Sequence, residues 1–256
     1  MATKKESVAD PARSLGLLWR TGDRSARSGL SVDAVVSAAI HMADAEGLEA
    51  VSMRRVAERL KVGTMSIYTH VPGKGELTEL MIDSALGELY EDVDEPARAP
   101  GGWRGALMFI ARSNWQLYQR HPWLLDLSSA RPVLGPHTTQ KYEAELRPLD
   151  GLGLSDVEMD SVLALVLTHV QATARALAAV SRTRRESGMT DSQWWLATAP
   201  LLEKLIDGRR FPVASRVGTS AGQAFDAASD PVHAMAFGLE VILDGVGTLI
   251  TTRTRD

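Results

Sequence analysis

Apolar side chains recur at helical spacing along most of this chain, and no convincing run of five or more residues alternates as a half-buried strand would. The first such segment starts at Ser31, a residue type that caps helix N-termini, and stops at Gly47. Beyond residue 70 the same pattern predicts helices at about 74–90, 103–120, 122–128, 136–147, 155–180, 191–206 and 231–250. Residues 207–230, rich in Gly, Ser and Ala, are predicted to form a long loop. The sequence therefore predicts an all-α fold.

The absence of cysteine and of long apolar runs limits where in the cell this protein is expected and which kinds of site it can have. The 256 residues contain no Cys, which excludes disulfides and thiolate metal sites and favours a reducing compartment. No uninterrupted apolar run approaches the roughly 18 residues that span a bilayer, and the first thirty residues lack the apolar core of a signal peptide. We therefore expect a cytoplasmic protein without a membrane partner.

Charge differs between the two ends of the chain, although the net charge is −4. Lys and Arg outnumber Asp and Glu by 11 to 9 over residues 1–78, and they are outnumbered by 17 to 23 in the remainder. A weakly basic N-terminal part on an acidic body is a weak indication of a nucleic-acid partner.

Residues 52–70 have the pattern of a helix-turn-helix: a helix capped by Ser52, a turn containing Gly63 and a second short helix at about 64–70. The slim side chains of Gly63, Thr64 and Ser66 would let the second helix approach base edges. Met65 could read only a thymine methyl group. Hydroxyl, imidazole and ammonium donors suited to phosphates follow at Tyr68, Thr69, His70 and Lys74.

The stretch "AAIHMADAEGLEAVSMRRVAERLKVGTMSIYTHVPGKGELTELMID" resembles the DNA-binding domain of TetR-family transcriptional repressors over about residues 31–83. The resemblance implies that Arg54 reaches the groove edge or a base, that Thr64, Met65 and Ser66 face bases, and that Tyr68, Thr69, His70 and Lys74 hold phosphates. Tyr68 could instead be half in the core. We expect the DNA-binding domain at residues 31–78, after a flexible arm at 1–30 with an apolar anchor at Leu15–Trp19. The arginines of that arm could follow the minor groove or be solvated.

The later stretches "ARPVLGPHTTQKYEAEL" and "AFGLEVILDGVGTLI" resemble the effector domain of tetracycline repressors. This implies an effector-binding and dimerisation domain at residues 79–256, with a homodimer formed through the helices at about 155–180 and 231–250. Two short reading helices held about one DNA turn apart would recognise a pseudo-palindromic operator in double-stranded DNA. The helix at about 74–90 would tie the reading helices to a small-molecule cavity within residues 103–171.

Candidate effector contacts are the polar and aromatic side chains on the helices around that cavity. They are Tyr90, Asn114, Trp115, Tyr118, Gln140, Glu143, Thr168 and His169. A histidine on an apolar helix face, such as His169, is more often a satisfied core histidine than a ligand contact.

One departure from tetracycline repressors concerns their magnesium site. Those proteins place a His, and a Thr three residues later, before an Arg-Pro turn, whereas this chain has Leu127 and Ala130 before Arg131. Because Leu cannot bind a hard cation, we expect a metal-free, largely apolar effector, with no cofactor and no metal site.

The alternative from another class of protein is an all-α enzyme that uses the cavity. The chain has no H-E-x-x-H and no phosphate loop, so we expect no catalytic residues. The sequence favours a repressor released from its operator by a ligand, and it leaves open an activator or a constitutive DNA binder of the same fold.

Overall fold

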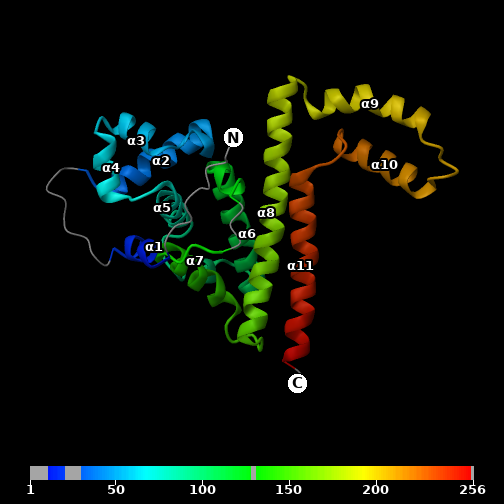
Figure 1. Ribbon diagram of the computed structural model, residues 1–256. Coiled ribbons are helices and arrows are strands. Elements are labelled where there is room, and N and C mark those ends of the chain that lie inside the picture. The colour runs from blue at the N-terminus through cyan, green and yellow to red at the C-terminus, as the bar shows by residue number, and fades with distance from the viewer. Residues whose placement is uncertain (1–10, 21–29, 128–130, 255–256) are drawn as a thin grey trace.

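The computed structural model describes residues 11–20, 30–127 and 131–254, and within these ranges all regular structure is helical (Figure 1). The α-helices are α1 (Pro11–Leu18), α2 (Val32–Glu46), α3 (Met53–Leu60), α4 (Thr64–His70), α5 (Lys74–Leu86), α6 (Gly102–Arg120), α7 (Pro136–Leu146), α8 (Asp156–Ser187), α9 (Asp191–Leu205), α10 (Pro212–Phe225) and α11 (Pro231–Arg253). Short 3₁₀ turns lie at η1 (Leu48–Ala50), η2 (Pro96–Arg98), η3 (Pro122–Leu125) and η4 (Arg147–Leu149). The all-α prediction is confirmed.

Local capping explains where the N-terminal helices begin and end. The Ser31 hydroxyl accepts a hydrogen bond from the Ala34 amide at 3.1 Å and so caps α2. Gly47, at φ +86°, ends α2 in a conformation that a residue with a side chain rarely adopts. Ser52 caps α3 in the same way as Ser31, and Lys61 closes it in the left-handed region. The caps at Ser31, Gly47 and Ser52 lie where the sequence predicted them, whereas the C-cap at Lys61 was not predicted.

The helix-turn-helix, α3 and α4, rests on α2 through a small apolar core. Val35, Val56, Ile67 and Val71 are all fully buried there. Ile67 is the only buried residue within α4, and Val71 directly follows the helix. A single inward residue leaves the rest of this short helix available for contacts outside the chain.

Two long helices, α8 and α11, form the spine of the C-terminal part and lie side by side in Figure 1. Helix α6 packs on the other side of α8, and α5 and α7 complete the layer next to the helix-turn-helix. Length and composition alone would let α8 or α11 cross a bilayer, although neither contains an uninterrupted apolar run of that length. Core helices of soluble proteins have the same composition, and here Leu163, Val166 and Leu243 are buried in a shared protein core.

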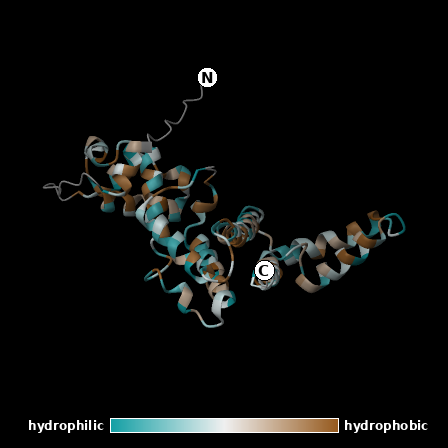
Figure 2. Cartoon of the chain, turned by 90° about the horizontal axis from the view of Figure 1, so that it is seen from below, coloured by the Kyte–Doolittle hydropathy of each residue, from teal (hydrophilic) through white to brown (hydrophobic). Residues whose placement is uncertain are grey.

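The predicted loop at 207–230 is wrong, because residues 212–225 form helix α10. Helices α9 and α10 make a hairpin that projects away from α2–α5 (Figures 1 and 2). Pro212 starts α10, and the Trp195 ring lies where a Cβ on Gly222 would be, 2.4 Å from ring carbon Cζ2. Glycine here permits close helix packing, whereas its frequency in the sequence suggested a loop.

The N-terminal arm also needs correction, because residues 11–18 form helix α1, which packs against α5. Leu18 is buried, and the Trp19 indole donates to the Leu134 carbonyl at 2.8 Å. The anchor predicted at Leu15–Trp19 therefore belongs to a docked helix. The rest of the predicted arm, with Arg24 and Arg27, lies outside the described residues.

Candidate DNA-reading helix and effector cavity

Helix α4 presents most of the predicted DNA-contacting residues on one exposed surface. Met65 is 76% exposed and Tyr68 is 43% exposed, while Ser66 and Thr69 are also exposed. Thr64 and His70, at the two ends, are half-buried. The Thr69 hydroxyl donates to the Ser66 carbonyl at 2.7 Å, which leaves its oxygen lone pairs as acceptors.

Gly63 precedes α4 as its N-cap and makes no side-chain cap. The Ser66 amide donates to the Gly63 carbonyl at 2.9 Å, no side chain caps the other amides of the first turn, and the positive end of the helix dipole lies at this end of α4. This geometry suits a negatively charged or hydrogen-bond-accepting partner.

The remaining predicted contacts lie on neighbouring helices. Arg54 on α3 is exposed, and its Nε donates to Glu58 Oε1 at 2.8 Å, which raises the pKa of Arg54. Lys74 is exposed at the first position of α5. Tyr68 is partly covered by the chain, since it is 43% exposed, and Arg55 is paired with Glu46 at 2.7 Å. The structure thus brings the nine predicted DNA-binding residues onto α3, α4 and the start of α5.

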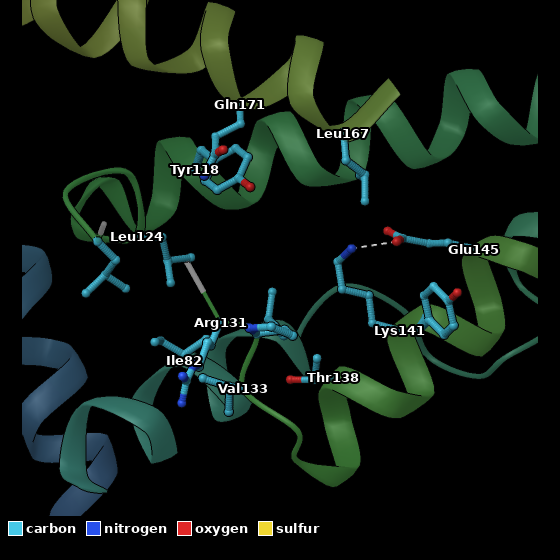
Figure 3. Close-up of a pocket in the computed structure, with 14 residues that line it drawn as sticks. Ile82, Tyr118, Leu124, Arg131, Val133, Thr138, Lys141, Glu145, Leu167 and Gln171 are labelled. Carbon is cyan, nitrogen blue, oxygen red and sulfur yellow. Dashed lines mark hydrogen bonds and ion pairs between the residues drawn. The ribbon is translucent and has the colours of Figure 1, made fainter. Parts of the chain in front are cut away.

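A cavity of about 380 Å³ lies among α5, α6, α7, α8 and the segment that precedes α7 (Figure 3). Its lining is mostly apolar. The lining residues are Ile82, Leu86, Tyr118, Leu124, Leu127, Arg131, Pro132, Val133, Thr138, Lys141, Tyr142, Glu145, Leu167 and Gln171. The size and apolar character suit a small organic molecule.

Of the eight predicted effector contacts, Tyr118 alone lines this cavity. Tyr90 and Asn114 lie behind the lining residue Glu145 and hydrogen-bond to it. Gln140, Glu143 and Thr168 are exposed, and Trp115 packs against the core. His169 Nε2 donates a hydrogen bond to the Met235 carbonyl oxygen at 3.0 Å, and the His169 ring contacts Gly238 on α11. The core-histidine alternative therefore fits His169.

Glu145 is the centre of a buried polar cluster that the sequence reasoning missed. Its Oε1 accepts hydrogen bonds from the Tyr90 hydroxyl and from Asn114 Nδ2, both at 2.8 Å, and its Oε2 accepts one from Lys141 Nζ at 2.5 Å. Burial and the adjacent Glu145 charge raise the pKa of Tyr90, and they raise the pKa of Tyr118 to about 12. Both phenols therefore remain neutral hydrogen-bonding groups at physiological pH.

Asp83 on α5 is a second buried carboxylate that the sequence reasoning missed. It accepts hydrogen bonds from His137 Nδ1, the Thr138 amide and the Thr138 hydroxyl, each at 2.9 Å. A Cβ on Gly135 would lie 2.2 Å from Asp83 Oδ1, so glycine is needed for this approach. A carboxylate at the N-terminus of α7 interacts favourably with that helix end, and it ties α5 to a wall of the cavity.

Leu127, which stands where tetracycline repressors have a metal-binding His, lines the cavity with its apolar side chain. Ala130 lies outside the described residues. Within the described ranges no group of three or more His, Cys, Asp or Glu side chains could hold a metal ion. Leu127 therefore supplies no oxygen or imidazole ligand for a hard cation at this position of the lining.

Comparison with known proteins agrees with this arrangement. Residues 35–81 match the family model described as bacterial regulatory proteins of the tetR family, and residues 95–250 match the tetracyclin repressor-like C-terminal domain. The chain is 42% identical to the HTH-type transcriptional repressor DrrR1 of Streptomyces coeruleorubidus, over 98% of this chain and 91% of DrrR1.

Two further relatives extend the comparison. The crystal structure of the Streptomyces coelicolor TetR family protein ActR in complex with actinorhodin superposes with a TM-score of 0.68 at 29% identity, over 85% of this chain and 95% of ActR. The class E tetracycline repressor protein of Escherichia coli is 27% identical over 84% of this chain and 93% of that protein. The relatives that carry functional names are regulators rather than enzymes. The chain therefore belongs to the TetR family of DNA-binding transcriptional repressors.

Proposed function

We propose that this chain is a homodimeric, cytoplasmic repressor that binds a pseudo-palindromic operator and leaves it when a small, metal-free and largely apolar ligand fills the cavity. The observation that carries this proposal is the course of helix α5. Lys74, a predicted phosphate contact, is its first residue, while Ile82 and Leu86 line the cavity. One rigid helix therefore spans the distance of about 12 Å between the DNA-facing surface and the ligand.

DNA recognition in this proposal follows the exposed surface of α4. Thr64, Met65 and Ser66 face base edges, and Arg54 reaches the groove once its pairing with Glu58 gives way to DNA. The amides at the start of α4, which no side chain caps, assist close approach to the DNA. The phosphate contacts come from Tyr68, Thr69, His70 and Lys74.

Release follows from a change in how α5 sits against the cavity. A ligand that contacts Ile82 and Leu86 favours positions of α5 that accommodate it, and Asp83 links that shift to α7. In a dimer the displacement alters the separation of the two α4 helices. A ligand that prefers the altered state shifts the population away from the DNA-competent one. ActR, which is similar over most of this chain, holds actinorhodin in its crystal structure, and this supports a ligand-responsive role.

Dimerisation is supported by the apolar side chains that α8 and α11 expose. Leu165 on α8 and Phe237 and Val241 on α11 are each more than half exposed. A second copy of the same two helices would cover them in a two-fold, self-complementary interface. Phe237→Glu should convert the dimer to a monomer in sedimentation measurements, while Val217→Glu on the exposed surface of α10 serves as a matched control. A wild-type monomer at micromolar concentration would overturn this part of the proposal.

The deciding experiment combines selection of bound genomic fragments with a mobility-shift assay in EDTA. The Tyr68→Phe, Lys74→Ala double variant should lose binding that the wild type shows at moderate salt, with its dimer and helical content intact. Lys204→Ala on α9 provides a control of equal charge change. Retained affinity in the double variant would refute the phosphate assignments, and an absolute need for a divalent ion would refute a metal-free repressor.

A further inference from the structure

The charged lining of the cavity is unevenly distributed. Three lining residues carry charge: Arg131 and Lys141 are cationic, and Glu145 is anionic. In Figure 3, Gln171 and Leu167 extend from α8 on one side, while Arg131, Thr138 and Lys141 lie on the opposite side. All three charged groups thus share one wall, which consists of α7 and the segment before it.

The carboxylate of Glu145 is already occupied. Its two oxygens accept three hydrogen bonds, from Tyr90, Asn114 and Lys141, and its side chain is 1% exposed. A ligand donor would therefore have to displace an existing bond to reach it. This makes Glu145 a poor primary contact for a cationic or donor-rich ligand.

Lys141 differs from Glu145 both in how many of its hydrogen bonds are used and in how exposed its side chain is. It gives one of its three protons to Glu145, and its side chain is more exposed than that of Glu145, at 12%. Other polar groups of the same wall are engaged elsewhere, because the Thr138 hydroxyl donates to Asp83 and the Tyr142 hydroxyl donates to Asp160, each at 2.9 Å. Lys141 therefore offers donors at the cavity surface, and the Tyr90–Asn114–Glu145 cluster holds it in place.

We propose that the cavity selects ligands that carry an anionic or strongly polarised acceptor oxygen, which binds Lys141 while the apolar body of the ligand lies against Leu167, Ile82 and Leu86. Glu145 is a positioning residue that orients the ammonium and lowers its net attraction for an anion. This inference rests on the proposed function, since it assumes that the cavity is the effector site.

The test uses two fluorescent probes of the same ring system, 8-anilinonaphthalene-1-sulfonate and its neutral analogue N-phenyl-1-naphthylamine, with the full-length dimer. The Lys141→Met, Glu145→Gln double variant should lose about tenfold in affinity for the sulfonate and keep its affinity for the neutral probe. The double change avoids leaving a buried carboxylate unpaired. Glu145→Gln alone should bind the sulfonate more tightly than the wild type, because the positive charge of Lys141 is then uncompensated.

Two controls separate the cavity from other surfaces. Lys204→Met makes the same charge change on exposed α9 and should alter neither affinity, and Leu86→Trp, which fills the cavity, should weaken both probes. The inference would be overturned if the Lys141→Met, Glu145→Gln double variant changed the affinity for both probes equally, or changed neither affinity. Mobility shifts with a selected operator fragment, run in parallel, distinguish the two failures. If only the neutral probe releases DNA, the charge preference is refuted and the proposed repressor function stands. If the probes bind in a charge-dependent way but release no DNA, the charge preference stands and the proposed repressor function is refuted.

Discussion

Removal of the Asp83 carboxylate is the sharpest test of how α5 is joined to the cavity wall. In Asp83→Ala, three donors at the start of α7 lose their acceptor: His137 Nδ1, the Thr138 amide and the Thr138 hydroxyl. The site is 4% exposed, so water replaces the carboxylate poorly. The favourable interaction of a negative charge with the N-terminus of α7 is lost as well.

The expected cost follows from these contacts. Hydrogen bonds to a charged acceptor contribute about 1.5–3 kcal/mol each; because the His137 side chain is 47% exposed we take the lower end, about 1.5 kcal/mol, and the helix-end interaction adds roughly 0.5 kcal/mol. In the variant, water partly hydrates the N-terminus of α7 and so offsets some of this summed loss of free energy. We therefore expect a loss of about 2–4 kcal/mol in the free energy of unfolding, which corresponds to a fall in Tm of roughly 5–12 °C for a chain of this size. Asp83→Asn, which keeps an acceptor oxygen, should lose about half as much.

The assay is thermal unfolding followed by far-ultraviolet circular dichroism, with the exposed Asp150→Ala as a control that should leave Tm unchanged. The same samples are tested for ligand-induced operator release in a mobility-shift assay. Asp83→Ala should bind operator without ligand but need more ligand for release, because α7 no longer moves with α5. A Tm within about 1 °C of the wild type would refute the energetic reasoning, and unchanged release would refute the coupling through Asp83.

Two further predictions concern contacts far from this site. The imidazole nitrogens of buried His121 lie 2.7 Å from Asp44 of α2 and 3.1 Å from Glu88. We therefore expect His121→Leu to lower the free energy of unfolding, measured by urea titration, by about 1–3 kcal/mol. An unchanged urea midpoint would contradict this prediction. The pKa of Glu158 is held at about 2 by the Ser155 amide and then by Arg253. Because this pKa is lowered in the folded state, its stabilisation is complete above about pH 4.5. The Tm advantage of the wild type over Glu158→Gln should vanish as pH falls toward 2, and a constant difference would refute the assignment.

The helix-turn-helix could be predicted from sequence because its determinants are local. Ser52, Gly63 and the slim residues of α4 act within a few residues of their own positions, through capping and turn geometry. The start and end of α4 agree with the predicted range for this reason. Because Ile67 is its single buried position, the orientation of α4 about its own axis follows from the sequence.

The cavity could not be predicted in the same way. On α7 the sequence reasoning chose Gln140 and Glu143, whereas Lys141 and Glu145 line the cavity. Successive residues of a helix differ by about 100° in direction, so a shift of one residue selects a different face. The same applies on α8, where Leu167 lines the cavity and its neighbour Thr168 is exposed.

By itself, the sequence determined the helical class, the capped helix-turn-helix and the family, since periodicity, caps and turns are properties of short segments. Tertiary structure alone decided which face of α7 turns inward, that Asp83 would meet the N-terminus of α7, and that Gly222 would allow α10 to pack on Trp195. Each of these depends on side chains far apart in the chain that come together only when the helices pack.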